Sequence, residues 1–124
     1  MAANRKRKPA PKYSERTLAV LRQLFSQYAG VEERRMFGYP AFFTRGRMFA
    51  CLHREGLGLK LSADRVAALL RRENCIPFRP HGRLMAQWVE IRHECAQDYR
   101  SDIADLRRSM RFVSRLASER EQPQ

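Results

Sequence analysis

The sequence of 124 residues contains no long apolar run. Its longest stretch without a charged residue is far shorter than the ~20 residues that a membrane span requires, so we expect no transmembrane helix. The charged N-terminus is not followed by an apolar segment, which excludes a secretory signal. A chain of this length buries roughly two-thirds of its unfolded surface and can fold without a disulfide or a metal. We therefore expect a cytoplasmic protein of one domain.

Cysteine is scarce, and its spacing fits no disulfide framework. The three cysteines, Cys51, Cys75 and Cys95, indicate free thiols in a reducing compartment. The pairs Cys51-x-His53 and His93-x-Cys95 could together supply four zinc ligands if both lay on extended strands. However, structural zinc usually binds pairs in turn-like knuckles, and Cys51 lies in an apolar run where cysteine packs as a small hydrophobe. We expect no metal site.

The sequence also lacks a catalytic motif. Its glycines never form a phosphate-binding loop before a helix, so nothing supports a nucleotide site. No cysteine lies in a glycine-rich loop with a base nearby, and Cys75 follows a predicted helix at the end where the dipole raises the pKa of a thiol. We therefore expect no catalytic residues, no cofactor and no small-molecule substrate, which makes the protein non-enzymatic.

Acidic residues are outnumbered almost two to one. The formal net charge is +12, from 25 basic and 13 acidic residues. Without five basic residues near the N-terminus, 20 basic against 13 acidic residues still leave +7. Such an excess attracts polyanions, and nucleic acid is the usual partner of this kind. The alternative is that 21 arginines against four lysines reflect the codon bias of a GC-rich genome, with no ligand involved.

The first thirteen residues have a composition of their own. They contain two prolines, no acid and no hydrophobic periodicity, which predicts a disordered basic arm over residues 1–13. Contacts between such an arm and phosphates would be non-specific and strongly dependent on salt. The arm supplies the candidate nucleic-acid contacts Arg5, Lys6, Arg7, Lys8 and Lys12.

Hydrophobic periodicity then predicts a helix followed by a sheet. Ser14 is placed to cap a helix whose apolar residues follow at helical spacing as far as Gly30. The period next shortens toward two, and Pro40 marks a bulge or an edge position because it cannot donate to the ladder. Turn-forming residues divide this part of the chain into three predicted strands at 31–43, 48–53 and 57–61.

The remaining residues predict two more helices around one or two strands. Ser62 caps a helix over residues 63–72 with a core stripe of Val66, Leu69 and Leu70. The segment 76–80 holds two prolines and is extended. The later elements are a strand at 84–91, a helix that begins between Asp98 and Ser101, and a frayed tail at 119–124. The whole pattern predicts an α+β domain with an antiparallel sheet of four to five strands flanked by helices.

Residues of the predicted sheet also suggest an interaction surface. Lys60 alternates with leucines, so it emerges opposite the core, either as a solvated residue or as the charged member of a groove. Trp88 either shields the sheet under a helix or forms an exposed contact. The candidate interaction surface consists of Lys60, Arg83 and Trp88.

Several short phrases occur in a characteristic order. They are Met36-Phe37-Gly38, Gly46-Arg47-Met48-Phe49-Ala50, Leu57-Gly58-Leu59-Lys60-Leu61, Pro77-Phe78 and Gly82-Arg83-x-Met85-x-x-Trp88-Val89. From Leu18 to about Val113 the chain resembles the N-terminal domain family of the TfoX/Sxy competence regulators. The resemblance implies a compact sheet flanked by helices, like that of secretion chaperones, and a role linked to transcription or nucleic acid. Classical members carry a second, helical C-terminal domain, whereas the resemblance of this sequence is to the N-terminal domain. We therefore expect residues 14–118 to be a stand-alone N-terminal-like domain.

We therefore interpret the chain as a small cytoplasmic regulatory protein that associates with nucleic acid. The alternative is a protein-interaction or dimerisation module without nucleic-acid binding, because an exposed strand edge can pair with a peptide or a second copy. Binding to DNA that weakens steeply with salt would favour the first interpretation, whereas self-association that is insensitive to salt would favour the second.

Overall fold

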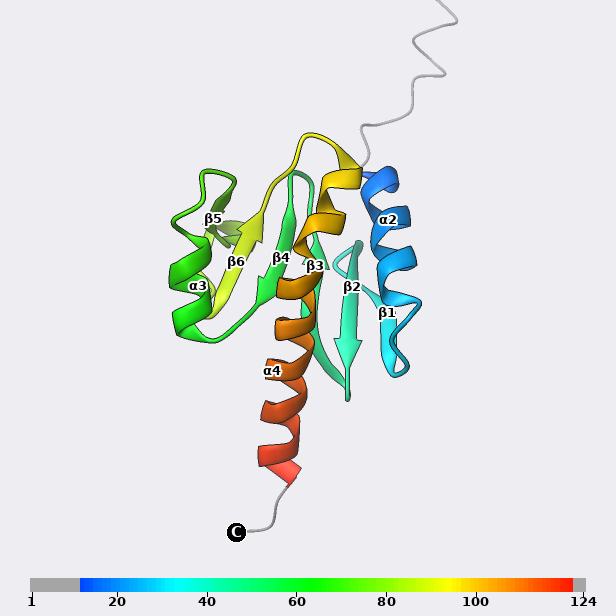
Figure 1. The fold of residues 1–124 in the computed structure, drawn as a ribbon, viewed down its shortest axis with the longest axis vertical. Coiled ribbons are helices and arrows are strands. Elements are labelled where there is room, and N and C mark those ends of the chain that lie inside the picture. The colour runs from blue at the N-terminus through cyan, green and yellow to red at the C-terminus, as the bar shows by residue number, and fades with distance from the viewer. Residues whose placement is uncertain (1–11, 122–124) are drawn as a thin grey trace, which may run out of the picture.

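The computed structural model describes residues 12–121 and contains one six-stranded antiparallel sheet with three α-helices (Figure 1). The strand order is β1-β2-β3-β4-β6-β5. The helices are α2 (Glu15–Phe25), α3 (Ala63–Leu69) and α4 (Ile103–Glu121). The strands are β1 (Val31–Met36), β2 (Tyr39–Thr44), β3 (Arg47–Leu52), β4 (Leu57–Lys60), β5 (Cys75–Pro77) and β6 (Trp88–Ile91). Two 3₁₀ segments, η1 (Pro80–Gly82) and η2 (Ala96–Asp102), complete the fold. The predicted α+β class is confirmed.

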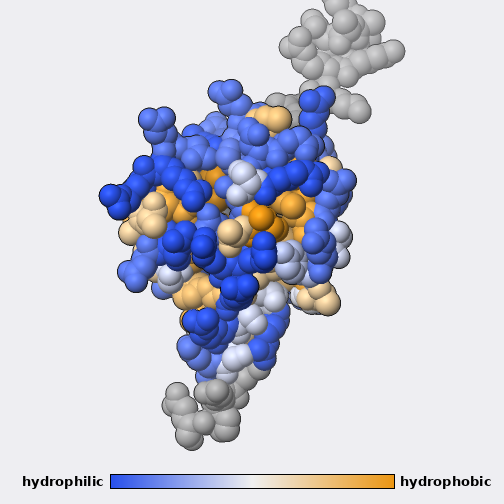
Figure 2. Space-filling view, in the orientation of Figure 1, coloured by the Kyte–Doolittle hydropathy of each residue, from blue (hydrophilic) through white to orange (hydrophobic). Residues whose placement is uncertain are grey.

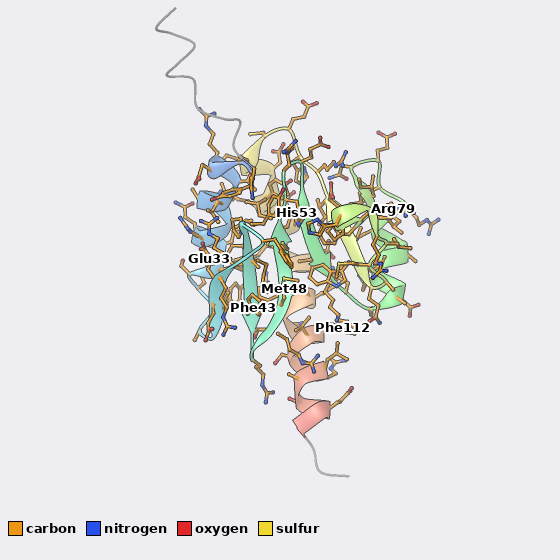
Figure 3. All side chains as sticks on the ribbon, turned by 180° about the vertical axis from the view of Figure 1, so that it is seen from behind. Glu33, Phe43, Met48, His53, Arg79 and Phe112 are labelled. Atoms are coloured by element: carbon orange, nitrogen blue, oxygen red, sulfur yellow. The ribbon has the colours of Figure 1, made fainter. Side chains whose placement is uncertain are left out.

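The helices gather on one face of the sheet. Helices α2 and α4 lie across this face, and α3 lies beside β6 (Figure 1). Seen from behind, the central strands carry no helix in the described part of the chain (Figure 3). The main core lies between the sheet and the helices and includes Leu21, Phe42, Phe49, Leu59 and Leu106. The fold therefore has two layers and one helix-free face.

Both predicted helix caps are confirmed. The Ser14 hydroxyl accepts a hydrogen bond from the Thr17 amide at 3.1 Å, and the Ser62 hydroxyl accepts one from the Arg65 amide at 3.4 Å. Each satisfies an amide that has no partner within the helix. Helix α3 is shorter than predicted, and of its expected stripe Leu69 is fully buried whereas Leu70 is 38% exposed. Leu70 follows the last helical residue, where it turns away from the core.

The first predicted strand is in fact two strands. Met36 pairs with Tyr39, so Phe37 and Gly38 form a two-residue turn with φ of 55° and 85°. These positive angles define the turn type that matches the twist of a hairpin. An aromatic residue rarely adopts them, so Phe37 carries no turn signal that could be recognised from its residue type. The extra hairpin and the short strand β5 bring the sheet to six strands.

The register of β2 and β3 decides between the two roles predicted for Pro40, a bulge or an edge position, in favour of the second. The bulge lies between Phe42 and Phe43, not at Pro40. Pro40 opposes Arg35 of β1, and pairing with β3 begins only at the next residue, Ala41. Pro40 therefore precedes the part of β2 that has neighbours on both sides.

The start of β6 and the end of α4 also differ from expectation. Strand β6 begins at Trp88 instead of residue 84, because Gln87 has a φ of 67° that interrupts an extended chain. Helix α4 continues past Ser118 to Glu121, and residues 122–124 of the expected tail lie outside the described residues. Of the expected arm, only Lys12 and Tyr13 are described, and Tyr13 packs against the main core.

Candidate functional site

Helix α4 presents a row of exposed arginines. Arg107, Arg111 and Arg115 follow one another at steps of four, and Arg108 lies next to them. Residues four apart on a helix are neighbours, and like charges at this spacing destabilise a helix by roughly 0.2–0.5 kcal/mol a pair. Strongly hydrophilic side chains follow the axis of α4 across the face seen in Figure 2. We call Arg107, Arg111 and Arg115 the arginine ridge.

No ion pair joins the ridge to an acidic side chain in the described part of the chain, not even to Glu119, which follows Arg115 by four residues. None of its three members forms an ion pair with another residue in 12–121, whereas Arg108 next to them does. The helix dipole favours cations, but only within about the last turn, and α4 continues to Glu121. Arg107 and Arg111 are too far from that end to gain from it. The ridge is therefore an excess of positive charge that the fold itself does not use.

A groove of about 220 Å³ runs between α3 and α4 on one side of the ridge. Leu61 and Phe112 give it an apolar part, and Ser62 adds a hydroxyl. Its basic lining consists of Arg65, Arg108, Arg111 and Arg115. We call this the arginine groove. The Nε atom of Arg65 is buried and has no hydrogen-bond partner, so one donor at the groove is unsatisfied.

One buried carboxylate holds part of the groove in place. Asp105 accepts hydrogen bonds from Arg65 at 3.1 Å and from Arg108 at 2.8 Å, and Arg72 lies 3.5 Å from its second oxygen. Its side chain is 4% exposed. Because this one carboxylate bonds only two of the groove's four arginines, the groove keeps a net positive charge while Arg65 and Arg108 are oriented.

A second hollow, of about 450 Å³, lies on the other side of α4. It shares Arg111 and Arg115 with the arginine groove and adds hydroxyl groups from Thr44, Ser114 and Ser118. Arginines and hydroxyls are the side chains that most often contact phosphate oxygens. The ridge is thus flanked on both sides by surfaces of the same chemical kind.

Asp102 extends the buried ion network toward the end of β6. It lies 2.7 Å from Nε2 of His93 and 3.8 Å from Arg72. Burial raises the pKa of Asp102, and the bond to His93 opposes this rise. Tyr99 packs edge-on against His93 and donates to the carbonyl of Ile91, and burial raises its pKa to about 12. These groups tie η2 and α4 to the sheet and to α3.

Two of the three residues predicted as an interaction surface, Lys60 and Trp88, lie on the opposite face. Lys60 and Trp88 are direct cross-strand partners on the helix-free face, as the alternation of β4 predicted. Trp88 is only 5% exposed and its ring centroid lies 5.6 Å from that of Phe78, so it is a packing residue. Lys60 is half-buried, and Arg83 is exposed in the loop after η1. The structure therefore brings Lys60 and Trp88 together and does not join Arg83 to them.

Four rings form a continuous row on this face. Tyr39 stacks on His53 at 4.3 Å, His53 meets Phe78 edge-on at 5.1 Å, and Phe78 leads to Trp88. Desolvation lowers the pKa of His53, and the charge of Glu90 partly offsets this effect. Figure 3 shows His53 on this face with Phe43 and Met48, which pack in a second small core.

Of the five predicted arm contacts, only Lys12 is described. Its ammonium lies 5.6 Å from the centroid of the Tyr39 ring, within the range of a cation–π contact. Arg5, Lys6, Arg7 and Lys8 lie outside the described residues. The arginines of α4 were not among the contacts predicted from the sequence. The spacing of 107, 111 and 115 was the available signal, but their lack of partners depends on the fold.

Of the three cysteines, Cys51 and Cys75 are buried packing residues, whereas Cys95 is exposed. Cys51 is buried on the helix-free face, and desolvation raises its pKa to about 12. Burial also raises the pKa of Cys75. A cleft of about 580 Å³ between α2 and the neighbouring loops is lined by His53, His93 and Cys95. Within residues 12–121, no three His, Cys, Asp or Glu side chains are placed to hold one metal ion.

Comparison with known proteins agrees with this architecture. The sequence model described as the TfoX N-terminal domain matches residues 23–113. This range begins within α2, includes the whole sheet and ends in α4, so it contains Arg107 and Arg111. No curated protein matches the chain. No helix in the described part of the chain is both long and apolar enough to cross a membrane.

Proposed function

Because the chain belongs to the TfoX N-terminal domain family, a family of regulatory domains, we propose that it is a non-enzymatic cytoplasmic regulator that binds the phosphate backbone of nucleic acid through α4. The observation that carries this proposal is the arginine ridge, whose charges have no partner among residues 12–121. Nucleic-acid phosphates relieve the repulsion along the helix, and their bound counterions are released to solution.

The surroundings of the ridge support a polyanion over a single small anion. Cationic and hydroxyl side chains continue from the arginine groove, over α4, to the hollow that contains Thr44 and Ser118. This surface extends along a helix of 19 residues, which at ~1.5 Å a residue spans several phosphates. Contacts of this type position a protein on nucleic acid without reading its bases. Binding is therefore non-specific.

The test is a titration of duplex DNA at two salt concentrations. Each phosphate that a cation neutralises adds about 0.9 to the slope of log affinity against log salt. Replacement of Arg111 and Arg115 by Ala should therefore weaken binding and flatten the slope by as much as about 1.8. Deletion of residues 1–11, measured separately, gives the contribution of that part of the arm and leaves Tyr13 in place against the core.

A matched control removes the same number of positive charges from a different part of the surface. Arg79 and Arg83 are exposed and form no ion pair in the described part of the chain, so the R79A/R83A variant loses the same charge on another surface. The proposal expects this control to bind almost as well as the unmodified chain. Equal slopes for both double variants would overturn the role of α4. Absence of DNA and RNA binding at low salt would overturn the function itself.

A further inference from the structure

Strand β1 is an edge of the sheet with an open backbone. Met36 and Tyr39 close a two-residue turn, and such a closing pair is hydrogen-bonded. Bonded pairs alternate along an antiparallel ladder, so the amides and carbonyls of Val31, Glu33 and Arg35 point away from β2. No backbone hydrogen bond joins β1 to a described residue outside the sheet. In Figure 3, Glu33 is labelled at the outer border of the sheet.

The side chains of β1 carry charges of both signs. Its sequence is Val-Glu-Glu-Arg-Arg-Met, and every residue after Val31 is exposed. Edge strands are usually protected by charges, and charges of a single sign repel a second copy. In β1 the acids precede the bases. Two copies that run antiparallel therefore bring the acids of each near the bases of the other.

Geometry limits how two copies can pair. A two-fold axis perpendicular to the sheet keeps the faces aligned, so only residues that point to the same face can lie opposite each other. The outward amides and carbonyls of residues 31, 33 and 35 in one copy must also hydrogen-bond with those of the same residues in the other copy. Two central registers satisfy both conditions. One centres on Glu33, and the other centres on Arg34.

The register centred on Glu33 is the better one. It places Glu32 opposite Arg34 of the second copy twice, in non-hydrogen-bonded positions where Cα atoms approach to about 4.5 Å. The two Glu33 residues then meet on the axis, but each already accepts hydrogen bonds from Arg22 of its own chain at 2.7 and 2.8 Å. The other register would instead place two Arg34 residues at the closest distance. The register centred on Arg34 also pairs fewer of the outward amides and carbonyls than the register centred on Glu33.

We infer that a second copy of this chain binds at β1, so that two sheets join into one through antiparallel β1 strands centred on Glu33. The exposed ion pair between Glu32 and Arg34 within one chain, at 2.7 Å, exchanges for the same pair between chains. Because exposed pairs contribute little to stability, this exchange costs little. The dimer does not use the arginine ridge, which lies on α4, and so is independent of the proposed function.

Charge exchange between two variants tests this interface. In this register, position 32 of each copy lies opposite position 34 of the other. The variant Glu32→Arg therefore places a base opposite a base at both pairs, and Arg34→Glu places an acid opposite an acid at both pairs. Each variant alone should therefore be monomeric by sedimentation equilibrium at low salt, while the unmodified chain is a dimer. An equimolar mixture of the two variants should form a heterodimer, because its four facing charges are again opposite. The combined variant E32R/R34E should again form a homodimer.

Controls separate this result from misfolding or another interface. Circular dichroism checks that each variant keeps its fold. The control Arg47→Glu reverses a charge on β3, which is separated from β1 by β2, and should leave the dimer intact. A monomeric unmodified chain at its highest soluble concentration would overturn the inference. Single variants that remain dimeric, or a mixture of folded variants that remains monomeric, would overturn it as well.

Discussion

Phe78 lies directly over Gly58 on the helix-free face. A Cβ atom added at Gly58 would come within 2.6 Å of Cζ of Phe78 and within 3.0 Å of two more atoms of the same ring. Gly58 lies on β4 between Cys51 and Glu90 of the neighbouring strands, so the ring occupies the space that a side chain would fill. This contact, rather than backbone freedom, explains a glycine in the middle of a central strand.

We predict that Gly58→Ala destabilises the protein by about 1–3 kcal/mol, because a well-packed ring must move. Urea unfolding gives the free energy of unfolding. The contact itself is tested by a double-mutant cycle with Phe78→Ala, which alone should cost about 3–5 kcal/mol. In the background of Phe78→Ala, Gly58→Ala should cost much less. Equal costs in both backgrounds would show that the ring is not the obstacle.

A second prediction concerns the turn at Phe37, which is 77% exposed and has a φ of 55°. The left-handed region costs an ordinary L-residue roughly 1–2 kcal/mol, and Asn tolerates it best after glycine. Phe37→Asn should therefore stabilise the protein by up to about 1 kcal/mol in urea unfolding, less the loss of the edge-on contact with His81 at 5.6 Å. Phe37→Val is the control, and its β-branched side chain should destabilise the turn.

The same turn shows why part of the fold could not be predicted from sequence. The caps at Ser14 and Ser62 depend on local chemistry, and the alternation of Lys60 with leucines depends on the strand period, so each was predictable. Phe37 adopts an angle that its type disfavours, and the pairing of β1 with β2 holds it in that conformation. The tertiary contacts therefore override the local preference.

The candidate site was less predictable for a related reason. The arginines of α4 are visible in the sequence, but whether a charge is free depends on which carboxylates the fold places beside it. Asp105 neutralises Arg65 and Arg108 from two different helices, and no described acid reaches Arg111. The edge position of β1 likewise depends on the strand order, which local patterns do not contain.

A third prediction follows from the lowered pKa of His53. Folding favours the neutral ring, so the unfolded chain binds more protons once the pH falls below the ordinary pKa of about 6.5. The contribution of His53 to stability is thus fully present above that pH and is lost progressively as the pH falls toward the lower pKa of the folded state. His53→Phe keeps a ring against Tyr39 and does not titrate.

The difference between the two proteins gives the test. The free energy of unfolding of the unmodified chain, relative to that of His53→Phe, should fall as the pH is lowered from about 7 to about 5. Other titrating groups are common to both proteins and cancel in this difference. A difference that stays constant over the range, or rises, would contradict the assigned direction.

The last prediction separates stability from binding at one residue. Asp105 orients Arg65 and Arg108, and Asp105→Asn removes the charge while it keeps an oxygen in place. Because Asp105 is itself buried, weaker bonds to its arginines should lower the free energy of unfolding by roughly 2 kcal/mol. The groove, however, loses the one carboxylate that opposes its arginines. If phosphates bind there, DNA affinity at low salt should rise and the salt slope should steepen by as much as about 0.9. Asp102→Asn serves as the control, since Asp102 pairs with His93 and Arg72 and with none of the arginines that line the groove. A loss of binding in Asp105→Asn at temperatures where it remains folded would mean that orientation of the arginines outweighs their net charge.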